Sequence, residues 1–190
     1  MKIVVVTSSP RSKKKSTSEF LAEKFIKGAE SNGHEIFRFD AGHSDINPCR
    51  GCDYCGMDGD CIIKDDISKN LTAKLVECDL IVLTTPLYYF EVSAQLKIVI
   101  DRFYARTGRI SGKKSILIAT AWNSDSWTMQ ALEQYYQTLV RYMRWQNLGA
   151  IYAVGCGYRD AVERSKFWRS SIETRQIDLN SIKFPRHRVL

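Results

Sequence analysis

Four short runs of consecutive hydrophobic residues recur along the chain, at residues 3–6, 80–83, 116–119 and 150–154. Runs of this length without polar interruption are typical of parallel strands that are covered by helices on both faces. A fifth segment, residues 34–39, interleaves charged and apolar side chains, which indicates a strand nearer an edge of the sheet. The pattern therefore predicts five strands.

Between these runs the apolar period changes to that of an amphipathic helix. Hydrophobic positions share one helical face in residues 92–103 and 129–143, and weaker helical patterns cover 16–31, 66–77 and 160–175. Strand and helix alternate along the chain, which implies right-handed crossovers. We therefore predict an α/β fold: a doubly wound, five-stranded parallel sheet in the flavodoxin-like order 2-1-3-4-5, with helices on both faces.

The composition agrees with one folded domain. The 190 residues are 44% hydrophobic and 26% charged, which is close to the average for globular proteins and excludes collagen-like, coiled-coil and disordered chains. We expect a single domain over residues 1–190, with one long irregular stretch at about 41–64, here called the cysteine loop. No apolar run approaches the roughly 18 residues that would span a bilayer, and residues 1–6 are too short for a signal peptide. We therefore expect a cytoplasmic location and no membrane partner.

The net charge is positive. Lysine and arginine number 28 against 21 aspartates and glutamates, which gives +7 and a pI near 9.1. Such a surface favours anionic partners such as phosphates or nucleic acid. No nucleic-acid recognition motif accompanies the charge, so we expect no nucleic-acid partner.

The turn after the first strand is the first candidate site, because ligands of an open α/β sheet bind beyond the carboxyl ends of its strands. Its hydroxyl side chains, the N-terminus of the following helix and Arg11 together suit a phosphate group. The candidate ligands are Ser9, Arg11, Ser16, Thr17 and Ser18. The turn lacks the glycines of a Rossmann dinucleotide-binding motif and the Gly-Lys-Ser/Thr ending of a Walker loop. A terminal monophosphate therefore fits this turn better than a pyrophosphate. Alternatively, Ser16 or Thr17 only caps the helix, and residues 13–15 are a solvated charge run.

Three segments carry a family resemblance. They are Ser9-Pro10-Arg11 followed by Ser16-Thr17, residues 85–97, and Asp101-Arg102-Phe103. Together they resemble the NADPH-dependent FMN reductase family of flavodoxin-like proteins, over most of residues 1–155. The resemblance implies FMN as the cofactor, NADPH or NADH as the electron donor, and a homodimer or higher homo-oligomer. The stretch between Arg11 and Ser16 is slightly longer and more basic than is usual in that family.

Two further loops are predicted to contact the flavin. Pro86 ends the third strand, and the residues after it supply apolar and aromatic surface, which suits the wall of a flavin ring. By resemblance, the residues beside the ring are Pro86, Leu87, Tyr88, Tyr89 and Phe90. Trp122 and Asn123, after the fourth strand, are candidates for a flavin or substrate wall. The alternative for residues 88–90 is that they belong to the ordinary core. The alternative for the loop after the fourth strand is that Trp127 packs at the start of a helix, with Ser126 or Asp125 as its cap.

Four cysteines fall in the cysteine loop, in the pattern Cys49-x2-Cys52-x2-Cys55-x5-Cys61. The spacing resembles that of the iron-sulfur flavoproteins, a branch of the same family, and implies a [4Fe-4S] cluster held by these four thiolates. Four thiolates also satisfy tetrahedral zinc, and a loop of metal-free thiols is the third interpretation. Cys78 and Cys156 lie apart in sequence and are predicted to be small buried residues.

These features predict an FMN-dependent NAD(P)H oxidoreductase. Electrons would pass from nicotinamide through FMN to a quinone, a nitro compound, free flavin or a bound [4Fe-4S] cluster, so the partners are a small-molecule acceptor or a redox protein. No catalytic acid or base is predicted, because FMN carries the chemistry. The alternative is a flavodoxin-like electron carrier that a protein partner reduces without nicotinamide turnover.

Overall fold

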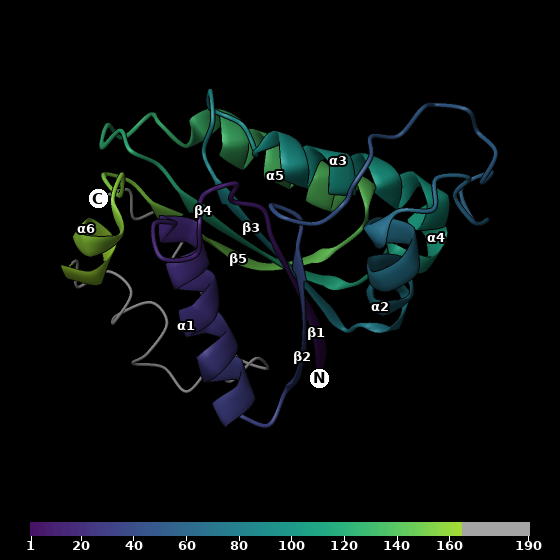
Figure 1. The fold of residues 1–190 in the computed structure, drawn as a ribbon, viewed down its shortest axis with the longest axis horizontal. Coiled ribbons are helices and arrows are strands. Elements are labelled where there is room, and N and C mark those ends of the chain that lie inside the picture. The colour runs from purple at the N-terminus through teal and green to yellow at the C-terminus, as the bar shows by residue number, and fades with distance from the viewer. Residues whose placement is uncertain (165–190) are drawn as a thin grey trace.

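The computed structural model describes residues 1–164, which form a parallel sheet flanked by helices on both faces (Figure 1). The strands are β1 Lys2–Thr7, β2 Glu35–Asp40, β3 Leu80–Pro86, β4 Lys114–Thr120 and β5 Gln146–Ala153. All neighbouring strands are parallel, and their order is β2-β1-β3-β4-β5. The predicted fold class and strand order are confirmed.

The helices lie close to their predicted positions. They are α1 Thr17–Ser31, α2 Thr72–Glu77, α3 Ala94–Arg102, α4 Thr107–Ile110, α5 Gln130–Tyr142 and α6 Arg159–Arg164. A π-helical turn at Ile67–Leu71 precedes α2, and a 3-10 turn at Phe103–Arg106 joins α3 to α4. The predicted helix at 160–175 begins as α6, and its remainder lies outside the described residues. None of the helices described is long and apolar enough to cross a membrane.

The sheet separates two hydrophobic cores, because alternate residues of a strand face opposite sides. In β1, Ile3 and Val5 pack with α1 and α6, whereas Val4 and Val6 pack with the layer of α2, α3, α4 and α5. All four side chains are at most 2% exposed. In Figure 1, α1 and α6 lie below the sheet, α3 and α5 lie above it, and α2 and α4 lie at its right. The carboxyl ends of the central strands therefore meet at one edge that both helical layers border.

Candidate functional site

A cavity of about 140 Å³ lies beyond the carboxyl ends of β1, β3, β4 and β5. This strand-end cavity is lined by Ser9, Arg11, Ser16, Thr17, Pro86, Leu87, Tyr88, Thr120, Ala121, Trp122, Cys156 and Gly157. Most of the predicted flavin-site residues are among them. Ser18, Tyr89, Phe90 and Asn123 are not. Thr120, Cys156 and Gly157 were missed as site residues by sequence reasoning, although each follows or ends a strand of the sheet.

One end of the strand-end cavity is rich in buried hydroxyl groups. Ser16 is the N-cap of α1, and its Oγ accepts a hydrogen bond from the N–H of Glu19 at 3.2 Å. Thr17 Oγ1 donates to Thr120 Oγ1 at 3.0 Å, which joins the start of α1 to the end of β4. The first N–H groups of a helix have no acceptor within the helix and carry its positive dipole end, so this corner suits an anion. Ser16 thus caps α1, as expected in the alternative interpretation, and lines the cavity as well.

Arg11 connects two loops at the same end. Its Nη1 donates to the carbonyl oxygen of Gly157 at 3.2 Å, so the loop after β1 is fastened to the loop after β5. The guanidinium supplies the positive charge of this corner and retains donors for a phosphate oxygen. Ser18 is buried and does not line the strand-end cavity, but its Oγ lies 3.2 Å from Oγ of Ser16, which does.

Two glycines allow close backbone contacts around the strand-end cavity. A Cβ on Gly42 would lie 2.1 Å from the carbonyl oxygen of Ser9, so only glycine lets the segment after β2 pack against the loop after β1. A Cβ on Gly157 would lie 2.6 Å from Cδ1 of Trp122, so this glycine makes room for the indole ring. Neither contact was predicted, because each joins residues that are distant in sequence.

Another part of the lining of the strand-end cavity is apolar and aromatic. Leu87 N–H donates to the carbonyl of Thr120 at 2.7 Å and extends the pairing of β3 with β4. Tyr88 and Glu91 then close a tight turn through two backbone hydrogen bonds of 3.1 and 3.2 Å. Its central residues, Tyr89 and Phe90, have φ angles of +47° and +67°. Residues other than glycine rarely adopt this left-handed backbone conformation. Strain of this kind costs on the order of 1–3 kcal/mol per residue and clusters at functional sites.

The aromatic side chains of this turn are at the surface. Tyr88, Tyr89 and Phe90 are 37%, 99% and 42% exposed, so the alternative that they form ordinary core is wrong. Phe90 stacks on Trp127, with ring centroids 5.2 Å apart. Asn123 bonds within its own loop, where its Oδ1 accepts from the N–H of Asp125 at 3.1 Å. Of the predicted aromatic wall, Tyr88 and Trp122 line the strand-end cavity.

The cysteine loop is held at its base by one buried ion pair. Arg102, at the end of α3, donates to Asp65 at 2.8 and 3.3 Å, and both side chains are 2% exposed. Burial alone would raise the pKa of the Asp65 carboxyl, but hydrogen bonds from Arg102 and from the N–H groups of Asn47 and Ser68 outweigh burial and hold the pKa below its ordinary value. In the sequence, Arg102 was noted within a segment that carries the family resemblance, but its partner, 37 residues earlier, was missed.

Exposed contacts hold the tip of the cysteine loop against the segment that follows α3. Tyr104 Oη donates to Asp53 at 2.6 Å, which raises the pKa of Tyr104 to about 12. Arg109 Nε donates to Asp58 at 2.8 Å. Arg106 pairs with the carboxylate of Asp60 and also donates to the carbonyl of Asp58. Ion pairs at the surface therefore hold the tip of the cysteine loop against this segment, and the buried Arg102–Asp65 pair holds the base of the loop.

The four thiols of the cysteine loop are free and accessible to different degrees. Cys49 and Cys52 are exposed, while Cys55 and Cys61 are half-buried. Within residues 1–164, no three His, Cys, Asp or Glu side chains lie close enough together to hold a metal ion. The donor set nevertheless suits a cluster: four unpaired thiols come from one loop.

The backbone of the cysteine loop turns sharply beside these thiols. Gly51, Asp53, Gly56 and Met57 all have positive φ angles, between +52° and +65°. The N–H of Gly51 donates to Cys49 Sγ at 3.4 Å. Turns of this kind direct backbone N–H groups into a concavity that binds anions and is common at iron-sulfur sites.

The two remaining cysteines are buried, as predicted. Burial raises the pKa of the Cys78 thiol to about 11 and also raises that of Cys156. Both thiols are therefore neutral at physiological pH, and neither is prepared to ligate a metal or act as a nucleophile.

A doubly wound parallel sheet whose switch point suits an anion is typical of nucleotide-binding α/β proteins. The comparison with known families is specific. A profile described as NADPH-dependent FMN reductase matches residues 1–159, and the chain belongs to this family. FMN is accordingly the cofactor of the family, and the predicted resemblance is confirmed.

The curated relatives point to the branch that the cysteine pattern resembles. The chain is 33% identical over 115 residues to an iron-sulfur flavoprotein of Archaeoglobus fulgidus, covering 60% of this chain and 51% of the relative. A second iron-sulfur flavoprotein of that organism is 40% identical over 100 residues, covering 53% and 49%. The chain spans about half the length of the curated relatives it matches.

Solved structures confirm the fold. An NAD(P)H:quinone oxidoreductase from Methanothermobacter marburgensis aligns with a TM-score of 0.68 at 14% identity, covering 99% of this chain and 98% of the other. An FMN-dependent NADH-azoreductase from Bacillus anthracis, solved in complex with FMN, aligns with a TM-score of 0.67 at 13% identity, covering 95% and 100%.

Proposed function

We propose that this protein is an FMN-dependent NAD(P)H oxidoreductase that passes electrons from nicotinamide to a small-molecule acceptor or a redox centre. One observation carries the proposal: the lining of the strand-end cavity combines an anion-binding corner with apolar and aromatic side chains. These two kinds of lining match the phosphate and the flat ring of FMN. Family membership supports the same cofactor.

Within this proposal, the chain positions FMN from both ends. Ser9, Ser16, Thr17 and Arg11 hold the phosphate through hydroxyls, the helix N-terminus and a charged fork. Pro86, Leu87, Tyr88 and Trp122 flank the ring. Bound FMN supplies the redox chemistry, because it accepts hydride from a reduced nicotinamide and releases the electrons to an acceptor.

The exposure of the aromatic wall supports turnover with a second, diffusible substrate. The strand-end cavity is smaller than the roughly 300 Å³ at which drug-sized ligand pockets begin, so it encloses only part of a flavin. Trp122 is 73% exposed beside it. A flavin held here keeps a face that nicotinamide and then an acceptor reach from solvent. Quinones, nitro compounds and free flavin are flat acceptors that suit such a surface.

The cysteine loop is proposed to hold a [4Fe-4S] cluster on Cys49, Cys52, Cys55 and Cys61. The free thiols, the sharp backbone turns and the similarity to iron-sulfur flavoproteins support this proposal. A cluster would serve as the acceptor for electrons from FMN. Structural zinc and metal-free thiols are the competing outcomes, and metal analysis separates them.

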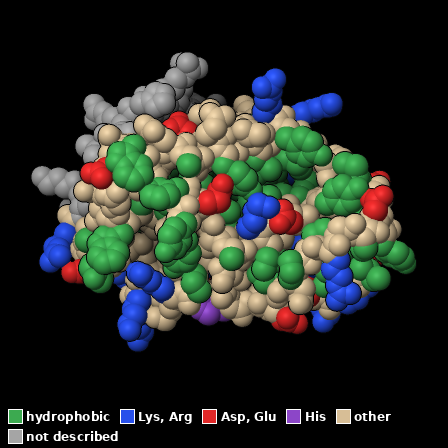
Figure 2. Space-filling view, turned by 90° about the horizontal axis from the view of Figure 1, so that it is seen from above, with side chains coloured by type: hydrophobic (Ala, Val, Ile, Leu, Met, Phe, Trp, Pro, Cys, Tyr) green, Lys and Arg blue, Asp and Glu red, His purple; other side chains and the backbone are tan. Residues whose placement is uncertain are grey.

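We also propose a homodimer. Figure 2 looks onto the layer of α3 and α5 and shows hydrophobic side chains exposed among charged ones. The large hydrophobic side chains that are more than half exposed include Tyr54, Tyr89, Trp122 and Tyr142. Exposed apolar surface of this kind marks interaction sites, and a second copy of the chain is the partner that family resemblance implies. A cytoplasmic location and a redox-protein partner remain predictions.

Anaerobic steady-state kinetics test the proposed activity. The FMN-loaded protein is expected to oxidise NADPH or NADH with a quinone as acceptor, measured as loss of nicotinamide absorbance. Protein stripped of FMN is the control and should be inactive. A loaded protein that neither nicotinamide reduces, but that a reduced redox protein does, would establish the electron-carrier alternative instead.

A further inference from the structure

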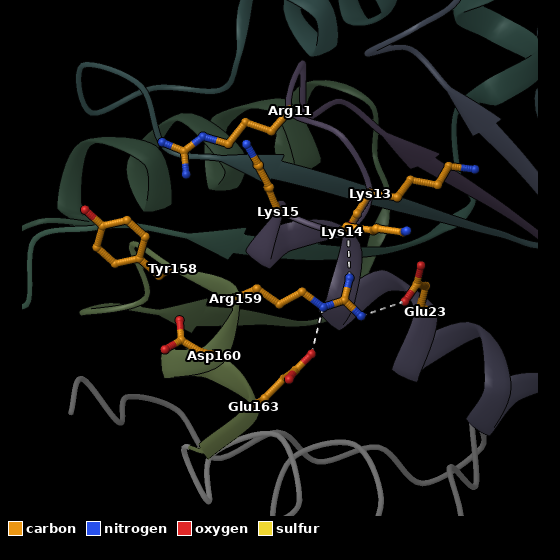
Figure 3. A pocket seen from close by; sticks show the side chains of 9 residues that line it. All are labelled: Arg11, Lys13, Lys14, Lys15, Glu23, Tyr158, Arg159, Asp160 and Glu163. Carbon is orange, nitrogen blue, oxygen red and sulfur yellow. Dashed lines mark hydrogen bonds and ion pairs between the residues drawn. The ribbon is translucent and has the colours of Figure 1, made fainter.

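A second hollow of about 990 Å³ adjoins the strand-end cavity, between the loop after β1, helix α1 and the start of α6 (Figure 3). Its lining residues are Arg11, Lys13, Lys14, Lys15, Glu23, Tyr158, Arg159, Asp160 and Glu163. This basic hollow shares Arg11 with the strand-end cavity. A ligand in one site is therefore adjacent to a ligand in the other.

The acidic residues of the basic hollow already have partners. Arg159 pairs with Glu163 at 2.7 Å and with Glu23 at 3.4 Å, while Asp160 pairs with Arg164 at 3.0 Å. By contrast, no carboxylate within the described part of the chain forms an ion pair with the four exposed cations of the loop, Arg11, Lys13, Lys14 and Lys15. Figure 3 shows these cations on one side of the hollow. The uncompensated charge attracts an anion.

Arg159 holds the lysine run in place. Its Nη1 donates to the carbonyl oxygen of Lys13 at 2.7 Å, and its guanidinium lies 5.0 Å from the centre of the Phe20 ring. The backbone that carries the lysines is thus tied to α6 and to α1. A fixed backbone lowers the entropy cost of bringing several lysines to one ligand.

An aromatic pair joins the two sites. Tyr158 lines the basic hollow and Trp122 lines the strand-end cavity, and their rings meet edge to face with centroids 6.0 Å apart. Tyr158 is 64% exposed, so its ring offers a surface on which a flat base can stack. Several cations beside an exposed aromatic ring are the chemistry that recognises a phosphorylated nucleoside.

We propose that the basic hollow binds the adenosine end of NADPH and that Lys13, Lys14 and Lys15 recognise its 2′-phosphate, which selects NADPH over NADH. This inference rests on the proposed function, since it supplies the donor site for the flavin held in the strand-end cavity. The volume of the basic hollow is near the upper limit, roughly 1,000 Å³, of small-molecule pockets and accommodates a nucleotide. The Trp122–Tyr158 pair connects the basic hollow to the residues proposed to flank the flavin ring, so the nicotinamide half of a nucleotide bound here would extend toward that ring.

The test uses the FMN-loaded protein and two triple variants of equal charge change. The first is K13Q/K14Q/K15Q. The control is K27Q/K69Q/K74Q, whose lysines are exposed and line neither site. Calorimetry measures the binding of 2′,5′-ADP and of 5′-AMP, and steady-state kinetics measure KM and kcat with NADPH and NADH.

We expect the first variant to bind 2′,5′-ADP about tenfold more weakly and to raise KM for NADPH by a similar factor, since it removes several charge-assisted phosphate contacts. KM for NADH and kcat should stay within about twofold, as should all constants of the control. The selectivity for NADPH is then lost without loss of chemistry.

Three results would overturn the inference. They are equal 2′,5′-ADP affinity in the two triple variants, wild-type affinity for 2′,5′-ADP no higher than for 5′-AMP, and equal displacement of 2′,5′-ADP by pyrophosphate or a single-stranded oligonucleotide. The last would identify a general polyanion surface. If neither nicotinamide is oxidised, the proposed function fails, but the 2′,5′-ADP titration still decides whether the lysines recognise this phosphate.

Discussion

Arg102 and Asp65 form a buried, two-pronged ion pair that closes the base of the cysteine loop. The same guanidinium donates to the carbonyl oxygens of Asn47 at 3.0 Å and Ile63 at 3.2 Å, which lie at opposite ends of the loop. One side chain of α3 thereby fixes both ends of the segment that carries the four cysteines. The base of the loop is thus fixed by protein contacts in which no cysteine takes part.

Arg102→Met should destabilise the protein strongly. The variant leaves the Asp65 carboxylate buried without its partner, and losing one member of such a pair costs about 3–5 kcal/mol. Urea denaturation measures the change in the free energy of unfolding. Lys97→Met is the control on the same helix, because Lys97 pairs with Asp101 at the surface and exposed pairs contribute about 0.5 kcal/mol. Equal losses in the two variants would contradict the role assigned to Arg102.

The contribution of Asp65 should depend on pH. Its pKa is depressed in the folded protein, so the carboxylate stabilises the fold above its unfolded pKa of about 3.9, and this stabilisation is lost as the pH falls through the folded pKa. The difference in unfolding free energy between wild type and Asp65→Asn should therefore be largest near neutral pH and shrink below about pH 4. Asp101→Asn, at the surface, should show a small difference throughout. A difference for Asp65→Asn that stays constant with pH would refute this account.

Arg11→Ala should weaken FMN far more than riboflavin. The variant removes a charge-assisted contact to the phosphate, worth about 1.5–3 kcal/mol, and riboflavin has no phosphate to lose. Fluorescence quenching measures both affinities. Arg109→Ala, which alters an arginine of α4, is the matched control and should leave both unchanged. Equal losses for the two flavins would mean that Arg11 does not recognise the phosphate.

Tyr88→Ala and Tyr89→Ala should differ, although the residues are adjacent. Tyr88 lines the strand-end cavity, whereas Tyr89 is 99% exposed. Removing the ring of Tyr88 should shift the visible spectrum or the reduction potential of bound FMN, because it changes the polarity beside the flavin. Tyr89→Ala should leave both properties at their wild-type values. An unchanged flavin in the Tyr88 variant would remove this turn from the flavin site.

Cys61→Ser should separate the two proposed cofactors. Wild-type protein reconstituted without oxygen should contain about four iron and four sulfide per chain, as a [4Fe-4S] cluster requires, and the variant should lose most of both while keeping FMN. Cys78→Ala, in the core, should retain the iron. Reconstituted wild type with neither iron nor sulfide would exclude the cluster, and about one zinc per chain would identify a four-thiolate structural site.

The centre of the sheet was predictable because its strands β1, β3 and β4 are buried on both faces. The runs at 80–83 and 116–119 are apolar throughout, which favours burial on both faces, and they lie within β3 and β4. The last strand was less predictable: it begins at Gln146, before the apolar run, because an edge strand tolerates polar residues and a bulge shifts its register with β4 near Ser115. The π-helical turn before α2 has no counterpart in the period-3.6 pattern.

The candidate site was predictable where one loop carries the chemistry. Ser9, Arg11, Ser16 and Thr17 follow β1 directly, and the structure gathers them at one cavity. The pairing of Arg102 with Asp65 was not predictable from the sequence, because it depends on how α3 packs against a loop 37 residues earlier. The different exposures of Tyr88 and Tyr89 could not be predicted either, since they depend on a tight turn with positive φ angles that no glycine signals in the sequence.

Gly42 brings together the two segments that are proposed to bind cofactors, the cysteine loop and the loop after β1. Its missing side chain lets the backbone that enters the cysteine loop press against the carbonyl of Ser9 in the loop after β1. Because the interior of a protein is close-packed, a displacement on one side of such a contact must be taken up on the other. A displacement of the backbone at Gly42 must therefore displace the loop after β1 as well, because the two segments are in direct backbone contact at Ser9.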